Sequence, residues 1–251
     1  MLKNRREQEI LHLMKAGGFV SVKELCAKLY ASESAIRRDL TALEKKGLLR
    51  KVYGGAEPIS NFRHIPPFPE RSHQNADAKR TIAEKAKNLI HDGNILFLDQ
   101  SSTSYYLAEK IAGNATLTVV TNNIEIIGLL SETSLTVISS GGTLSRDNRN
   151  CLLGTDARRI FEKTYADIAF FSTKSLSFDG IVSDCSREEV TVREAMLQNC
   201  AKRVFLCDSE KLGRRSPYTQ TSLSEVDVWV CEKAPDENVE FRVLFPSLEI
   251  L

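Results

Sequence analysis

The chain has 251 residues, of which 42% are hydrophobic and 27% charged, and its 34 basic and 33 acidic residues give a net charge of +1. This length and composition are typical of a globular protein of two domains, and no apolar run approaches the roughly 18 residues that a membrane-spanning helix needs. The first residues lead into a charged helical pattern without the apolar core of a signal peptide, so we expect a cytoplasmic protein with no membrane partner.

Three short helical patterns occupy the start of the chain. The first covers residues 5–15 and the second covers residues 22–29, and each repeats apolar residues at helical spacing. Ser21 can cap the second helix, and only residues 30 and 31 connect this helix to the third. Two tightly joined helices after a first one predict a helix-turn-helix.

The third helical pattern, residues 32–43, carries two adjacent arginines. Ser32 is a good N-cap, and Ile36, Leu40 and Leu43 form one buried stripe. The residues left on or beside the open face are Ser34, Ala35, Arg37 and Arg38. An arginine in the major groove can bind O6 and N7 of guanine, so we expect this face to contact operator DNA.

Residues 48–56 have the pattern of a small β-hairpin with exposed basic residues, which would make the module a winged one. Arg50 and Lys51 would bind phosphates and position the domain without reading sequence. We include Ser21, Ser32 and Tyr53 among the residues expected to contact DNA.

The alternative for the third helix is a solvated charged helix, because acidic residues are interleaved with its basic ones. The distribution of charge argues against that alternative. Residues 1–57 carry 12 basic and 7 acidic residues, a charge of +5, whereas the remainder carries 22 and 26, a charge of −4. A basic head on an acidic body is the charge distribution expected of a domain that binds double-stranded DNA.

Residues 58–77 contain four prolines and are expected to form an extended, partly stiff linker, with the apolar residues 65–69 packed on the domain that follows. The six cysteines include no C-x-x-C pair, and the four histidines are not spaced as metal ligands. We therefore expect buried, reduced cysteines, no metal site and no cofactor.

From residue 78 to 251 the chain alternates helical patterns with short strands, which predicts an α/β domain with a mainly parallel sheet. Strands are expected at residues 94–99, 117–121, 135–139, 167–171, 203–207 and 226–231. Helices are expected at residues 78–90, 103–111, 123–130, 155–163 and 188–199.

Small polar residues cluster where the predicted strands end. They are Asp99, Gln100, Ser101, Ser102, Thr103, Thr121, Asn122, Asn123, Gly141, Gly142 and Lys211. Open α/β sheets bind ligands at this edge, and hydroxyl residues at a helix N-terminus favour a phosphate or carboxylate. The alternative is that these residues are ordinary helix caps. Neither G-x-G-x-x-G nor G-x-x-x-x-G-K-[ST] occurs, so nucleotide sites are unsupported.

These residues together resemble the DeoR family of bacterial transcriptional regulators over nearly the full chain. The matching motifs are residues 22–25, 34–40 and 53–56 in the head and residues 99–103, 121–123, 141–142 and 208–211 in the body. The resemblance implies an N-terminal winged helix-turn-helix and a C-terminal Rossmann-like α/β sensor domain similar to ribose-5-phosphate isomerase. It also implies a repressor of carbohydrate metabolism genes that leaves operator DNA when a phosphorylated sugar or related metabolite binds.

The resemblance is incomplete at the start of the third helix and in the first loop of the body. Ala31 and Ala35 stand where the family usually has a β-branched residue and a threonine, and Gln100 stands where it usually has glycine. Fewer hydroxyl contacts to DNA are then available from this helix. We expect domains at residues 1–57 and 78–251, the second one sensing the effector and assembling a homodimer or homotetramer.

Two other functions are compatible with the pattern. The body could be a sugar-phosphate isomerase, with a base among Asp99, Asp179 and Asp184 and with Lys174 as an electrophilic group. The lysine loop and the catalytic acid motif of those isomerases are not recognisable, so we do not expect an enzyme. The body could also oligomerise without binding any metabolite.

Overall fold

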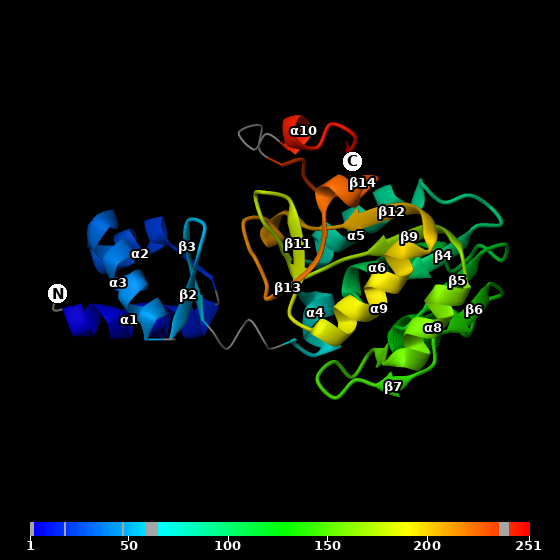
Figure 1. Ribbon diagram of the computed structural model, residues 1–251, viewed down its shortest axis with the longest axis horizontal. Helices are drawn as coiled ribbons and strands as arrows, with labels where there is room; N and C mark the ends of the chain where they lie inside the picture. Colours follow the sequence, from blue (N-terminus) through cyan, green and yellow to red (C-terminus); the bar gives the residue numbers. More distant parts are fainter. Residues whose placement is uncertain (1–2, 18, 47, 59–64, 236–240) are drawn as a thin grey trace. The chain divides into compact units, whose positions relative to one another are not determined.

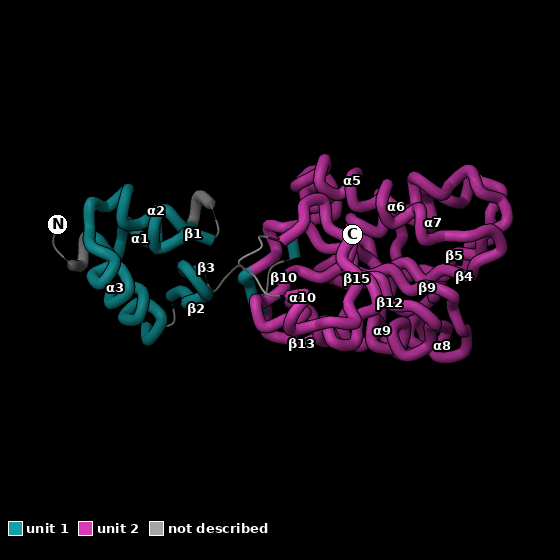
Figure 2. Tube along the Cα trace, turned by 90° about the horizontal axis from the view of Figure 1, so that it is seen from above, with its two compact units in different colours: residues 1–65, 213–215 teal, residues 66–212, 216–251 magenta. Residues whose placement is uncertain are grey.

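The computed structural model describes all residues except 1–2, 18, 47, 59–64 and 236–240. The chain divides into two compact units, shown in Figure 2. One consists of Met1–Ile65 with Gly213–Arg215, and the other of Pro66–Leu212 with Ser216–Leu251. We call the first the DNA-binding unit, after the winged helix-turn-helix that the sequence predicts there, and the second the body.

The DNA-binding unit is a winged helix-turn-helix, as predicted. Its helices are α1 (Lys3–Gly17), α2 (Val22–Leu29) and α3 (Glu33–Lys45), and its strands are β1 (Val20–Ser21), β2 (Leu49–Val52) and β3 (Gly55–Pro58). The strands form an antiparallel sheet in the order β1-β3-β2, with β2 and β3 as the wing (Figure 1).

Local sequence explains these boundaries. Ser21 and Ser32 cap α2 and α3, because their hydroxyl oxygens accept hydrogen bonds from the backbone N–H groups of Glu24 at 3.1 Å and Ala35 at 3.3 Å. Gly55 allows β3 to approach β1, since a Cβ there would lie 2.3 Å from the carbonyl oxygen of Val20. The core of the unit includes Ile36, Leu40 and Leu43 of the predicted stripe, together with Ile10, Met14 and Leu25.

The body is built on a seven-stranded sheet in the order β15-β14-β12-β9-β4-β5-β6, and every adjacent pair is parallel. Its strands are β4 (Ile95–Leu98), β5 (Thr118–Thr121), β6 (Thr136–Ser139), β9 (Ala166–Phe171), β12 (Cys200–Leu206), β14 (Val228–Val230) and β15 (Glu249–Ile250). The predicted α/β fold with a mainly parallel sheet is confirmed.

Helices cover both faces of this sheet (Figure 1). They are α5 (Ala76–Lys87), α6 (Ser102–Ile111) and α7 (Ile124–Leu130) on one face and α8 (Thr155–Lys163) and α9 (Arg187–Gln198) on the other. Alternate strand residues face opposite cores, so that Leu96 and Leu98 lie in the same core as Ile82 of α5, whereas Phe97 packs against Phe161 of α8.

Several short elements were not predicted. A second sheet joins β10 (Ser175–Leu176), β11 (Ile181–Asp184) and β13 (Tyr218–Ser222), and β7 (Thr143–Leu144) pairs with β8 (Leu152–Leu153). The helix α10 (Phe241–Leu244) precedes β15. Within the described residues, every helix is too short or too polar to cross a membrane.

The prediction of an extended linker through residue 77 is wrong over its second half. Residues Phe68–His73 form helix α4, and α5 already begins at Ala76. Pro69 lies in the first turn of α4, where its missing N–H costs no hydrogen bond, so the proline did not prevent a helix. The packing expected of this segment on the body is confirmed for Phe68, which meets the ring of Tyr105 edge-on, with ring centroids 5.3 Å apart.

Candidate functional site

The open face of α3 presents the two predicted arginines. Ser34, Arg37 and Arg38 are exposed, and Ala35 is half-buried. The guanidinium of Arg37 donates hydrogen bonds to the Glu33 carboxylate, at 3.1 Å from Nε and 2.5 Å from Nη2. Nε of Arg38 donates to the backbone oxygen of Ser34 at 3.2 Å. Arg37 is thus paired with an acid one turn away on its own helix.

The wing places a third cation beside the same helix. The Lys51 ammonium donates to the hydroxyl oxygen of Thr41 at 2.9 Å, and its backbone N–H donates to the Glu44 carboxylate at 2.8 Å. Arg50 lies on the same strand, and Tyr53, at the turn of the wing, is 79% exposed. The structure therefore joins Lys51 to α3, while Ser21 and Ser32 act as helix caps.

In the body, the predicted loop at residues 99–103 is held by hydrogen bonds of its own. Ser101 caps α6 by accepting a bond from the N–H of Ser104 at 3.0 Å, and the hydroxyl of Ser104 donates to Asp99 Oδ1 at 2.7 Å. Thr121 donates to the carbonyl of Leu98 at 2.7 Å, and Asn123 caps α7. The cap interpretation is thus correct for Ser101 and Asn123.

A buried arginine holds this loop in place, and the sequence pattern did not reveal it. The guanidinium of Arg193, on α9, pairs with Asp99 at 3.0 Å and Asp184 at 3.2 Å, and donates to Gln220 Oε1 at 2.9 Å. Burial disfavours the charged guanidinium, but Asp184 and Asp99 outweigh it and raise the pKa of Arg193. The cluster ties the sheet edge to α9 and to the second sheet.

An amide network connects the predicted loop at residues 99–103 with the one at residues 121–123. Gln100 Nε2 donates to the buried Glu189 carboxylate at 2.8 Å, and Asn122 Nδ2 donates to Gln100 Oε1 at 3.4 Å. Asn122 is fully buried, and its Oδ1 finds no hydrogen-bond donor among the described residues. Burial, followed by the charge of Asp184, raises the pKa of Glu189.

Three cations lie near these loops, and two of them were not predicted. The predicted one, Lys211, donates to the Ser172 hydroxyl at 2.8 Å and pairs with Asp208 at 3.3 Å. Lys79 is 5% exposed, and its ammonium donates to the backbone oxygens of Gln74, at 2.6 Å, and of Arg71. Burial and the charge of Lys211 lower the pKa of Lys79 to about 8.

The second unpredicted cation is Arg71, on α4. Its Nη2 donates to Oδ1 of Asn148 at 2.9 Å and to Oδ1 of Asn150 at 2.7 Å. Among the residues that the structure describes, neither Arg71 nor Lys79 forms an ion pair with a carboxylate. Both cations are thus held by neutral oxygen atoms beside the predicted loops.

The other predicted residues take different positions. Ser102 and Thr103 are buried at the start of α6, and the hydroxyl of Ser102 donates to the backbone oxygen of Arg71 at 3.3 Å. Gly141 and Gly142 form an exposed turn after β6 with φ angles of 64° and 99°. A Cβ on Gly142 would lie 2.5 Å from the Leu153 oxygen, so close packing accounts for this glycine.

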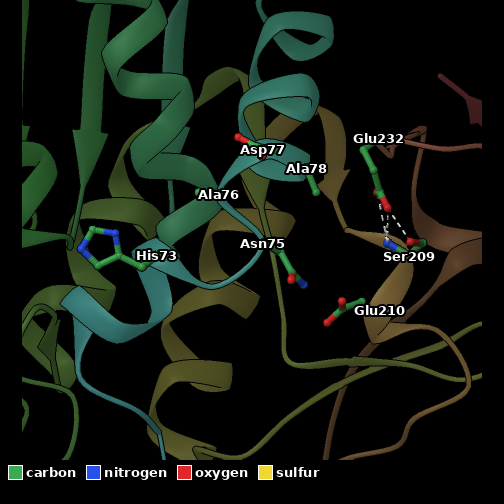
Figure 3. A pocket seen from close by; sticks show the side chains of 8 residues that line it. All are labelled: His73, Asn75, Ala76, Asp77, Ala78, Ser209, Glu210 and Glu232. Carbon is green, nitrogen blue, oxygen red and sulfur yellow. Dashed lines mark hydrogen bonds between the residues drawn. The ribbon is translucent and has the colours of Figure 1, made fainter.

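One cavity of about 440 Å³ lies beside the start of α5 (Figure 3). It is lined by His73, Asn75, Ala76, Asp77, Ala78, Ser209, Glu210 and Glu232. Glu232 accepts hydrogen bonds from the backbone N–H and the hydroxyl of Ser209, which Figure 3 shows as dashed lines. Three carboxylates in its wall disfavour a phosphate ligand, and none of the predicted effector residues lines it.

Two family models match this chain. The DeoR-like helix-turn-helix domain matches residues 6–62, and the DeoR C-terminal sensor domain matches residues 74–233. The first match covers α1 to the wing, and the second covers most of the body with its sheet-edge loops.

Curated relatives match over nearly their whole length. The HTH-type transcriptional regulator GlpR of Haloferax volcanii is 32% identical over 94% of this chain and 92% of its own. The lactose phosphotransferase system repressor of Staphylococcus aureus is 31% identical over 96% of both chains. A ribose 5-phosphate isomerase from Methanocaldococcus jannaschii aligns with 55% of each chain at 17% identity and a TM-score of 0.42, a likeness too weak to support a conclusion.

Proposed function

Because the chain belongs to the DeoR family of DNA-binding transcriptional regulators, we propose that it represses genes of carbohydrate metabolism and responds to a phosphorylated sugar or related anion. The observation that carries the DNA-binding part is the exposed face of α3, with Ser34, Arg37 and Arg38 on a capped helix. Lys51 and Arg50 of the wing would bind the phosphate backbone.

The effector part of the proposal is supported by two features of the sheet edge. Lys79 and Arg71 are cations whose described partners are neutral oxygens, and an anion would compensate their charge better than a carbonyl does. Asn122 Oδ1 is a buried acceptor that a sugar hydroxyl could satisfy. One relative, named lactose phosphotransferase system repressor, is consistent with an effector from sugar metabolism.

The isomerase alternative has no support of its own. A base for isomerisation must be free to take a proton, but two of the three candidates, Asp99 and Asp184, pair with the buried Arg193. The named curated relatives are transcriptional regulators, so we interpret the body as a sensor rather than an enzyme.

We expect a phosphorylated sugar to raise the unfolding temperature of the full chain in a thermal-shift screen at pH 7, because a ligand that binds only the folded state stabilises it. The Lys79 ammonium, with its pKa of about 8, is charged at pH 7 and loses its charge as the pH rises towards 9.5. A phosphate ester is dianionic over most of this range, since its second pKa is about 6. The stabilisation should therefore shrink at the higher pH.

Two controls separate the possible causes. Lys79→Arg keeps a positive charge at both pH values, so the stabilisation by the same sugar phosphate should no longer fall with pH. The corresponding unphosphorylated sugar should give no shift at either pH. If no sugar phosphate stabilises the chain more than its unphosphorylated form, the proposal is wrong, and a body that only oligomerises becomes the better account.

A further inference from the structure

We propose that Arg71 is an effector ligand carried on a lid, and that it exchanges the amide oxygens of Asn148 and Asn150 for the oxygens of the bound anion. The lid is the α4 segment, residues 66–75, which includes helix α4. This inference rests on the proposed function, because it concerns the same anion site.

The α4 segment covers the start of α6 through several contacts. The Ser102 hydroxyl donates to the backbone oxygen of Arg71 at 3.3 Å, and the Tyr106 hydroxyl donates to the backbone oxygen of Ser72 at 3.0 Å. Phe68 packs edge-on against Tyr105. The segment therefore lies on the helix N-terminus that the sequence pattern predicts as the phosphate site, and its own carbonyl accepts the hydrogen bond of Ser102 there.

The partners of the Arg71 guanidinium are weak ones for a cation. Nη2 bonds two neutral amide oxygens, Nε donates to the Pro66 carbonyl at 3.1 Å, and the guanidinium carbon lies 5.6 Å from the ring centroid of Phe68. A phosphate offers charged oxygens that match the two-pronged geometry of a guanidinium, and such charge-assisted bonds are about twice as strong as neutral ones. A bound anion would thus draw Arg71 away from the two asparagines.

This exchange would change the contacts that link the α4 segment to the sheet edge. Asn148 also donates to Glu189, and Asn150 donates to the backbone oxygen of Gln100, so both asparagines belong to the network of the predicted loops. In the sequence the α4 segment directly follows Ile65, where the longer part of the DNA-binding unit ends. The lid is therefore one part of the body from which anion binding can reach the DNA-binding unit along the chain.

The test measures the unfolding temperature of the full chain against inorganic phosphate, with sodium chloride of equal ionic strength as reference. We expect the wild type to be stabilised and Arg71→Gln to need about tenfold more phosphate for half the effect, because a charge-assisted contact is lost. The phosphate concentration that Arg71→Lys needs should lie between those of the wild type and Arg71→Gln, since lysine keeps the charge but lacks the two-pronged geometry of the guanidinium. Lys110→Gln removes an exposed cation that pairs with Glu84, and should respond as the wild type does.

A purely structural role for Arg71 would lower the unfolding temperature without phosphate but leave the phosphate dependence unchanged. That result overturns the inference, and so does a wild type that phosphate does not stabilise beyond chloride. If the sugar phosphate found by the screen stabilises the wild type and Arg71→Gln equally, the inference fails and the proposed function stands.

Discussion

Replacing Arg193 with alanine is expected to lower the free energy of unfolding of the body by about 3 to 5 kcal/mol, the usual cost of removing one partner from a buried ion pair. Asp99 and Asp184 would both keep a buried charge without its cation. Arg193 is fully buried and also donates to Gln220, so the substitution leaves a cavity as well as unpaired polar groups.

Urea unfolding of the full chain, followed by a probe of the body such as the fluorescence of the buried Trp229, measures this change. Arg158→Ala is the matched control, because Arg158 forms an exposed pair with Glu162 and its loss should change stability by less than about 0.5 kcal/mol. Adding Asp99→Asn and Asp184→Asn to Arg193→Ala should restore part of the loss. A change for Arg193→Ala no larger than that of Arg158→Ala would show that the cluster does not hold the body together.

The substitutions Arg37→Ala and Arg38→Ala are each expected to weaken binding to the DNA upstream of the chain's own gene by about 1 to 3 kcal/mol, or roughly 5-fold to 150-fold. The loss should be smaller on DNA of scrambled sequence, because an arginine that reads a base contributes little there. Lys51→Ala should weaken binding to both DNAs by a similar factor, since its proposed contact is a phosphate. Fluorescence anisotropy at one fixed salt concentration measures all of these affinities.

Glu33 supplies an independent check of the same interface. Its carboxylate holds the Arg37 guanidinium in the free protein, and an acidic side chain near phosphates opposes binding. Glu33→Gln should therefore raise the affinity for the DNA upstream of the chain's own gene. Unchanged affinity in Arg37→Ala and Arg38→Ala, together with no gain in Glu33→Gln, would exclude α3 as the reading helix.

The DNA-binding unit was predictable because its signals are local. The caps Ser21 and Ser32, the stripe of Ile36, Leu40 and Leu43, and the short turn before α3 each depend on residues within a few positions of one another. The parallel sheet of the body followed from the same kind of pattern, since strands and helices alternate along the chain. The roles assigned to Arg37 and Arg38 remain predictions.

The sheet edge was harder to predict because its contacts are distant in sequence. Arg193 lies 94 residues from its partner Asp99, and Arg71 lies 79 residues from Asn150. No periodic pattern distinguishes these arginines from solvated ones. The prolines around α4 favoured an extended linker, although Pro69 in fact lies in the first turn of a helix. The only available signal was a pair of basic residues, Arg71 and Lys79, flanking the predicted start of the body.

The affinity of the full chain for the DNA upstream of its own gene, measured with and without the sugar phosphate found by the screen, tests the central claim most directly. We predict binding at least a thousandfold tighter than to scrambled DNA, in the range of specific regulators, and at least a tenfold loss of that affinity when the sugar phosphate is saturating. Equal affinity for the two DNAs, or an affinity that the sugar phosphate leaves unchanged, would contradict the account.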